Sequence, residues 1–140
     1  MNANNKIILD FLKQHTLAVI ATVGTDSKPE SAVVGISETE DLEVIFGTSN
    51  VSRKYQNLQS NPHVSFTIGW DDQDTITVQY EGRAQELSAS EIEKAKAAHL
   101  KKIPTSAKFL ERPDQRYFKV TPTWVRYSNF RGNNIFEVTF

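Results

Sequence analysis

The sequence predicts a mainly β fold with flanking helices, an α+β architecture in which short antiparallel strands form a barrel or a sandwich. Short runs rich in Val, Ile, Thr, Phe and Tyr recur along the chain, separated by turns that contain Gly, Pro, Asn or Asp. Helical periodicity is confined to segments at the start, in the middle and before the final strands. Tight turns between the strands favour antiparallel pairing over a doubly wound parallel sheet.

The first half of the chain predicts two helices and three strands. A helix is expected at 2–14, where apolar residues recur at helical spacing: Ile7, Ile8, Phe11 and Leu12. The run 17–23 lacks polar alternation, so we expect a strand buried on both faces, paired as a hairpin with a strand at 30–36. A third strand is expected at 42–46. A short helix then ends at Pro62 and buries Val51, Tyr55 and Leu58.

The second half predicts more strands and one further helix. Alternation indicates strands at 64–70 and 75–84, and Gly82 inside the latter indicates a β-bulge or a close backbone approach. Ser88 and Glu91 have capping-box spacing and open a helix that runs to about Leu100. The remaining elements are one helical turn at 107–110, strands at 117–120 and 124–127 separated by Pro122, and a last strand at 135–140.

The composition is typical of one globular domain that covers residues 1–140. Hydrophobic residues make up 39% of the chain, charged residues make up 24%, and the net charge is −1. This balance gives no electrostatic reason to expect binding to nucleic acid or to an anionic membrane. No apolar run approaches the ~20 residues that span a bilayer, and no apolar signal segment opens the chain. We therefore expect a cytoplasmic protein without membrane or nucleic-acid partners.

Several chemistries have no support in the sequence. The chain has no cysteine, which excludes disulfides, Cys-ligated zinc, iron–sulfur clusters and thiol catalysis. His15, His63 and His99 are far apart in the sequence, so no metal site is expected. The acidic run 71–74 lacks the spacing of a calcium loop and suits a solvated hairpin tip. An enzymatic activity would therefore depend on a bound cofactor.

One stretch combines a helix start with residues suited to phosphate. Thr48, Ser49 and Ser52 gather where the second helix begins, and their oxygens can cap its free N–H groups. Arg53 and Lys54 follow in the first turn, where the helix dipole disfavours cations unless an anion lies among them. Hydroxyls, free N–H groups and two cations together indicate a phosphate site. The same residues would also suit an ordinary capped surface helix with solvated cations.

The order of these elements resembles the pyridoxamine 5′-phosphate oxidase-like family, the FMN-binding split barrels, over about Ile7 to Tyr127. The resemblance is carried by the opening hairpin at 17–29, the segment 46–54, Asn57-Leu58, Asn61-Pro62 and Val64, the strand 80–84, and the closing segment 118–127. The chain length and the leading helix resemble the small general-stress-protein branch of this family more than the longer true oxidases.

The resemblance implies an antiparallel split β-barrel and a homodimer with two FMN molecules at its interface. It implies that the second strand offers backbone groups along the flavin ring at Ser31, Ala32, Val33 and Val34. The residues it places at the ribityl chain and the phosphate are Thr48, Ser49, Ser52, Arg53 and Lys54. It also implies that Thr77 stands where a Gln of the partner subunit often reaches the flavin, and that Trp124 or Arg126 approaches the ring.

The chain also departs from the true oxidases. Those enzymes carry an Arg and a Lys around an R-x-V-L-L-K-like second strand, whereas Ser31–Ile36 supplies no cation. Each lost charge-assisted contact would be worth ~1.5–3 kcal/mol when well formed, so the resemblance implies weaker FMN binding. The Gln is replaced by Thr77, and the W…R pair that holds pyridoxal phosphate is not reproduced after Trp124. Both differences argue against pyridoxamine phosphate oxidation.

These observations favour an FMN-dependent oxidoreductase or reductase whose small-molecule substrate the sequence does not indicate. In a second hypothesis the cleft holds a deazaflavin or haem, with His63 or His99 as the axial ligand of the haem iron. In a third hypothesis the protein is a non-catalytic ligand-binding or stress-response protein that has lost tight cofactor binding.

Overall fold

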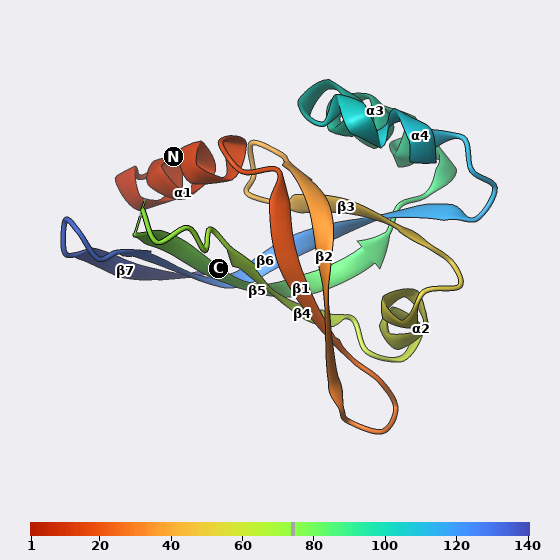
Figure 1. Ribbon diagram of the computed structural model, residues 1–140, viewed down its shortest axis with the longest axis horizontal. Coiled ribbons are helices and arrows are strands. Elements are labelled where there is room, and N and C mark those ends of the chain that lie inside the picture. Colours follow the sequence, from red (N-terminus) through yellow and green to blue (C-terminus); the bar gives the residue numbers. More distant parts are fainter. Residues whose placement is uncertain (74) are drawn as a thin grey trace.

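The chain folds into a six-stranded antiparallel barrel, as a computed structural model describes for residues 1–73 and 75–140. The strands pair in the order β3-β2-β1-β4-β5-β6-β7, and a further pairing of β3 with β6 closes the first six into the barrel. Figure 1 shows β7 extending from the edge of this barrel. The strands are β1 (Leu17–Val23), β2 (Pro29–Glu38), β3 (Val44–Ser49), β4 (His63–Ile68), β5 (Ile76–Glu86), β6 (Gln115–Asn129) and β7 (Asn134–Thr139).

Four helices and one 3₁₀ turn surround the strands. Helix α1 packs against β2 and β7, helix α2 against β1 and β3, and helix α3 against β2 and β3. Figure 1 shows the short α4 beside α3. No helix among the described residues is long and apolar enough to cross a membrane. The elements are α1 (Ala3–Lys13), α2 (Arg53–Ser60), α3 (Ala89–Lys102), the 3₁₀ turn η1 (Pro104–Ser106) and α4 (Ala107–Leu110).

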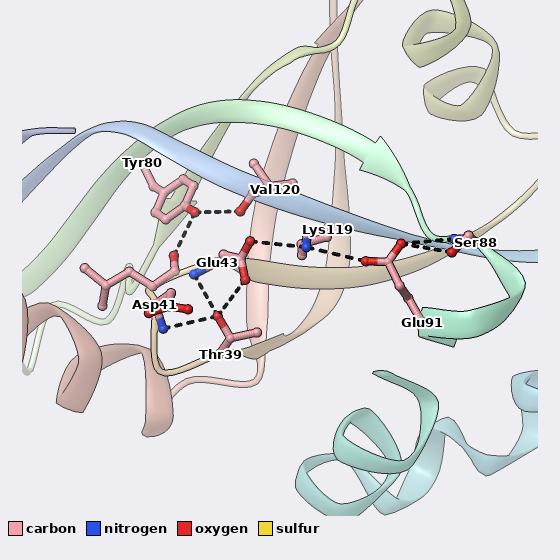
Figure 2. A network of polar contacts seen from close by, with 9 residues as sticks. Thr39, Asp41, Glu43, Tyr80, Ser88, Glu91, Lys119 and Val120 are labelled. Atoms are coloured by element: carbon pink, nitrogen blue, oxygen red, sulfur yellow. Dashed lines mark hydrogen bonds and ion pairs between the residues drawn. The ribbon is translucent and has the colours of Figure 1, made fainter. Parts of the chain in front are cut away.

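Aromatic side chains fill the barrel. Phe46 stacks on Phe118 with their ring centroids 5.3 Å apart, and Phe66 meets Tyr80 edge to face at 5.6 Å. The Tyr80 hydroxyl lies 2.8 Å from the Leu42 carbonyl oxygen and 2.9 Å from that of Val120, so it can donate to either. Tyr80 thereby joins the β2–β3 turn to the closing strand β6, as Figure 2 shows. Burial raises the pKa of Tyr80, which keeps the hydroxyl protonated as the donor.

The predicted capping box of α3 is present and connects to the barrel. The Glu91 carboxylate accepts from the backbone N–H and the hydroxyl of Ser88. Figure 2 shows Lys119 of β6 between Glu91 and Glu43, with nitrogen–oxygen distances of 3.6 and 3.5 Å. This network attaches the start of α3 to β6 and to the β2–β3 turn.

Other local predictions are also confirmed. The expected helical turn is present and spans Ala107–Leu110. The pairing of β5 with β6 shifts register between Glu81 and Gly82, which is the predicted bulge. A Cβ on Gly82 would lie 2.5 Å from the Thr121 carbonyl oxygen, so the backbones approach closely there.

Three predictions about the elements were wrong. The two strands expected around Pro122 form one strand, β6, because Pro122 lies opposite Gly82 at the bulge, where a missing N–H is tolerated. Strand β1 is buried on one face only, and Leu17 is 50% exposed. Val51 precedes α2 and is 79% exposed, so its predicted burial was wrong. Leu58 is buried as predicted, Tyr55 is half-buried against the core, and Asn57 is a buried residue that was not predicted.

Several strand ends also differ from the prediction. Strand β3 continues to Ser49 because it pairs with β6 as far as Gln115, whereas β4 ends at Ile68, two residues early. Helix α3 continues to Lys102. One residue of the acidic turn expected at 71–74, Asp74, lies outside the described residues.

We predict that Tyr80→Phe lowers the free energy of unfolding by about 1–2 kcal/mol, because the buried Leu42 and Val120 carbonyls lose their donor. Urea denaturation monitored by circular dichroism measures this loss. The control is Tyr127→Phe, because Tyr127 is another buried tyrosine and its ring packs against those of Phe11 and Phe136. Equal losses in the two variants would contradict the role given to Tyr80.

Candidate functional site

Two hollows lie where β2 and β3 meet the start of α2. The larger, here called the groove, has a volume of about 580 Å³ and lies between β2, β3 and the segment from α3 to α4. The smaller, here called the α2 cavity, has a volume of about 100 Å³ and is lined by β1, β2 and α2. Lys54 lines both hollows. The groove alone falls within the roughly 300–1,000 Å³ of small-molecule sites.

The predicted cap at the start of α2 is present. The Ser52 Oγ accepts from the backbone N–H of Tyr55 at 3.2 Å, and it lies 2.8 Å from the Thr48 Oγ1. The N–H groups of Arg53 and Lys54 lie in the first turn, where the helix itself supplies no acceptor. Ser49 has a different role, because its hydroxyl donates to Asp114 at 2.7 Å and this bond lowers the pKa of that carboxyl.

The two predicted phosphate cations have different surroundings. Arg53 Nη1 lies 2.6 Å from Glu30 Oε2 in an ion pair within the chain. Lys54 is partly buried and forms no ion pair among the described residues. Burial lowers the pKa of Lys54, and the charge of Arg53 lowers it further. Lys54 is therefore the cation of this pair that has no protein carboxylate beside it.

The predicted residues of β2 divide between the two hollows. Ser31 and Ala32 line the α2 cavity, and Val33 and Val34 line the groove. Val33 is 60% exposed whereas Val34 is buried, as expected for alternating positions on a strand. The groove thus has an apolar wall that is open to solvent on one side.

Thr77 and Trp124 do not reach either hollow within their own chain. The Thr77 hydroxyl donates to the Ile68 carbonyl oxygen at 3.3 Å, at the far end of β5. Trp124 lies on β6 between Glu81 and Thr139 of the neighbouring strands, and the adjacent candidate Arg126 pairs with Glu137 at 3.4 Å. Neither side chain is therefore part of the lining of these hollows in its own chain.

A buried histidine on the wall of the groove, His99, was predicted as a candidate haem ligand but not as a residue of the FMN site. His99 Nδ1 lies 2.9 Å from the Ser37 hydroxyl, and the ring meets Tyr117 edge to face at 5.9 Å. Burial lowers the pKa of His99, and the charge of Lys102 lowers it further. The sequence could have indicated its burial, because His99 lies four residues after Ala95 and therefore on the same apolar face of α3. His63 lies outside the groove, 3.5 Å from Arg83.

Other residues of the groove were also missed. Lys108 and Arg112 lie over the Phe109 ring, at 5.0 and 5.8 Å from its centroid, and all three line the groove. Lys102 holds the wall in place, because its ammonium donates to the carbonyl oxygens of Leu12 and His15 at 2.9 and 2.6 Å.

Among the described residues, no group of three or more His, Asp or Glu side chains forms a metal-binding cluster.

Comparison with known proteins places this barrel in a family. The family model described as pyridoxamine 5′-phosphate oxidase matches residues 5–129, so the chain belongs to the pyridoxamine 5′-phosphate oxidase family of split barrels. The pyridoxine/pyridoxamine 5′-phosphate oxidase of Chromobacterium violaceum is 32% identical over 84 residues, which are 60% of this chain and 39% of that protein. The match thus spans about two fifths of the length of that curated relative.

Solved structures share the fold at lower identity. A heme binding protein from Mycobacterium smegmatis has a TM-score of 0.86 and 18% identity, over 99% of this chain and 59% of that one. The General Stress Protein 26 from Bacillus anthracis has a TM-score of 0.75 and 19% identity, over 98% of this chain and 100% of that one. At such identities the likeness shows the fold alone. The predicted likeness to the general-stress-protein branch is confirmed at the level of fold.

We predict that protonation of His99 destabilises the fold. Its pKa is lowered in the folded chain, so the folded state binds fewer protons than the unfolded state below the ordinary value of 6.5. The stability that the neutral His99 contributes to the fold is fully present above pH 6.5 and is lost as the pH falls below that value. Denaturation between about pH 7.5 and pH 5 should show a smaller loss of unfolding free energy in His99→Gln than in the wild type. Parallel pH profiles would contradict this assignment.

Proposed function

We propose that the protein binds FMN and acts as a small oxidoreductase, with the flavin phosphate at the start of α2 and the ring along β2 in the groove. One observation carries the proposal. Lys54 is a partly buried cation with no ion pair among the described residues, beside the first-turn N–H groups of α2 and at the junction of the two hollows. A bound phosphate would compensate for the burial of this charge.

The donor set fits a phosphate group, though with fewer cations than the resemblance implies for true oxidases. Lys54, the N–H groups of Arg53 and Lys54, and the Ser52 hydroxyl are the candidate donors. Val33 and Phe109 would cover an aromatic ring and exclude water from it. When bound, the flavin would supply the hydride chemistry. The residues of this chain would bind and orient it.

We also propose that the active form is a homodimer with the cofactor at its interface. The rim of the groove exposes apolar side chains that a partner would cover, since Leu17, Val33 and Val51 are 50%, 60% and 79% exposed. A partner would also supply Thr77 and Trp124, which lie far from the groove of their own chain.

Haem binding in the groove is a second candidate. His99 lines the groove, and its lowered pKa keeps the imidazole in the neutral form that ligates iron. The bond between Nδ1 and Ser37 leaves Nε2 as the ligand atom. A Soret band after addition of haem, lost in His99→Gln, would support this candidate. A deazaflavin or a non-catalytic role would instead follow if neither FMN nor haem is retained.

We predict that Lys54→Ala weakens FMN binding at least tenfold, because a charge-assisted contact of about 1.5–3 kcal/mol is lost. Arg53→Ala should weaken it by only about threefold, since Arg53 is already paired with Glu30. Titrations that follow the quenching of flavin fluorescence measure both constants. Lys28→Ala, at an exposed lysine on the β1–β2 turn, is the control. An unchanged affinity in Lys54→Ala would place the phosphate elsewhere.

We predict that Val33→Asp weakens the dimer and FMN binding together, because it puts a charge on the apolar rim of the groove. Sedimentation equilibrium should show a dimer dissociation constant at least about tenfold higher than that of the wild type. Ile135→Asp, at an exposed position of β7, is the matched control. A Val33→Asp variant that remains as dimeric as this control would exclude the groove rim from the interface.

A further inference from the structure

The carboxylate of Glu30 occupies the place where a ligand anion would meet Arg53. Glu30 lines the α2 cavity together with Arg53 and Lys54, and its Oε2 lies 2.6 Å from Arg53 Nη1. The Glu30 side chain is 28% exposed, whereas that of Arg53 is 73% exposed. The ion pair thus joins a largely enclosed anion to a cation that can move in solvent.

The Glu30 carboxylate is also fixed from its other side. Its Oε1 accepts from Asn57 Nδ2 at 2.9 Å, and the same amide group donates to Thr22 Oγ1 at 2.9 Å. Asn57 is buried on α2, so its side chain holds Glu30 at the wall of the cavity. The carboxylate is therefore built into the site by residues of β1, β2 and α2.

A dianionic phosphate in this position would meet two opposing effects. Lys54 and the first-turn N–H groups attract it, whereas the fixed charge of Glu30 repels it and holds Arg53. Arg53 has enough exposure to leave Glu30 and pair with the phosphate. Among the described residues, Glu30 is then left with its hydrogen bond from Asn57 and no ion pair. Binding must supply the energy of this exchange.

We propose that Glu30 competes with the ligand phosphate for Arg53 and thereby makes FMN an exchangeable ligand instead of a permanently held one. Glu30 then determines how strongly the site favours FMN over riboflavin, because it acts on the phosphate of FMN and not on the flavin ring. This inference rests on the proposed function for its ligand, and inorganic phosphate tests it separately.

The test is Glu30→Gln, which removes the charge and keeps an oxygen that can accept from Asn57. FMN should bind to the variant on the order of tenfold more tightly and dissociate more slowly than from the wild type. Riboflavin, which lacks the phosphate, should bind with an affinity within about twofold of the wild-type value. The matched control is Asp10→Asn, which removes the carboxylate of another 2.6 Å ion pair, on α1 and remote from the site.

Two results would overturn the inference. FMN affinity in Glu30→Gln that is unchanged or weaker would show that Glu30 does not compete with phosphate. An equal gain for FMN and riboflavin would show that Glu30 acts on the flavin ring or on the shape of the site.

A further measurement separates this inference from the proposed function. Titration with inorganic phosphate, followed by the NMR shifts of the Arg53 and Lys54 amides, applies to the wild type and to Glu30→Gln. If neither protein binds FMN, the proposed function fails. The competition of Glu30 with phosphate for Arg53 is still supported if these amides saturate at a lower phosphate concentration in the variant, and it is refuted if the two titrations coincide.

Discussion

The pairing of β3 with β6 is the constraint on which the site depends. It closes the barrel from Val44 opposite Val120 to Ser49 opposite Gln115. Because β3 stays paired as far as Ser49, the chain enters α2 from a fixed position, and Asp114 can accept from the Ser49 hydroxyl. The same closure holds the segment from α3 to α4, which immediately precedes β6, beside the groove. The barrel therefore sets the distance between the start of α2 and the α4 wall.

Charge at the start of α2 departs from the pattern that the resemblance to the true oxidases implies. The second strand brings no cation, and its first residues bring the carboxylate of Glu30, which pairs with Arg53. Lys54 is left as the partly buried cation without a protein partner among the described residues. The site thus has an anion of its own, held by the buried Asn57. We infer that a bound phosphate would be attracted by Lys54 and repelled by Glu30. This opposition suits a ligand that binds reversibly and exchanges.

Features of the fold and the site that depend on local sequence were predictable, whereas those that depend on distant residues were not. The Ser52 cap, the capping box of Ser88 and Glu91, and the bulge at Gly82 follow from short patterns. The bonds from Asn57 to Glu30 and between Ser37 and His99 join residues 27 and 62 positions apart, and no pattern marks them. Val51 was assigned to the buried face because helical spacing was extended two residues before the actual start of the helix at Arg53.

The phosphorus-31 NMR spectrum of FMN bound to the wild-type protein tests the central claim most directly, because it observes the phosphate itself. If the phosphate lies against Lys54 and the start of α2, its resonance should move away from that of free FMN. Its change with pH should also be suppressed, since the surrounding donors stabilise the dianion. A flavin whose absorption changes on binding, while its phosphorus resonance keeps the position and the titration of free FMN, would contradict the claim.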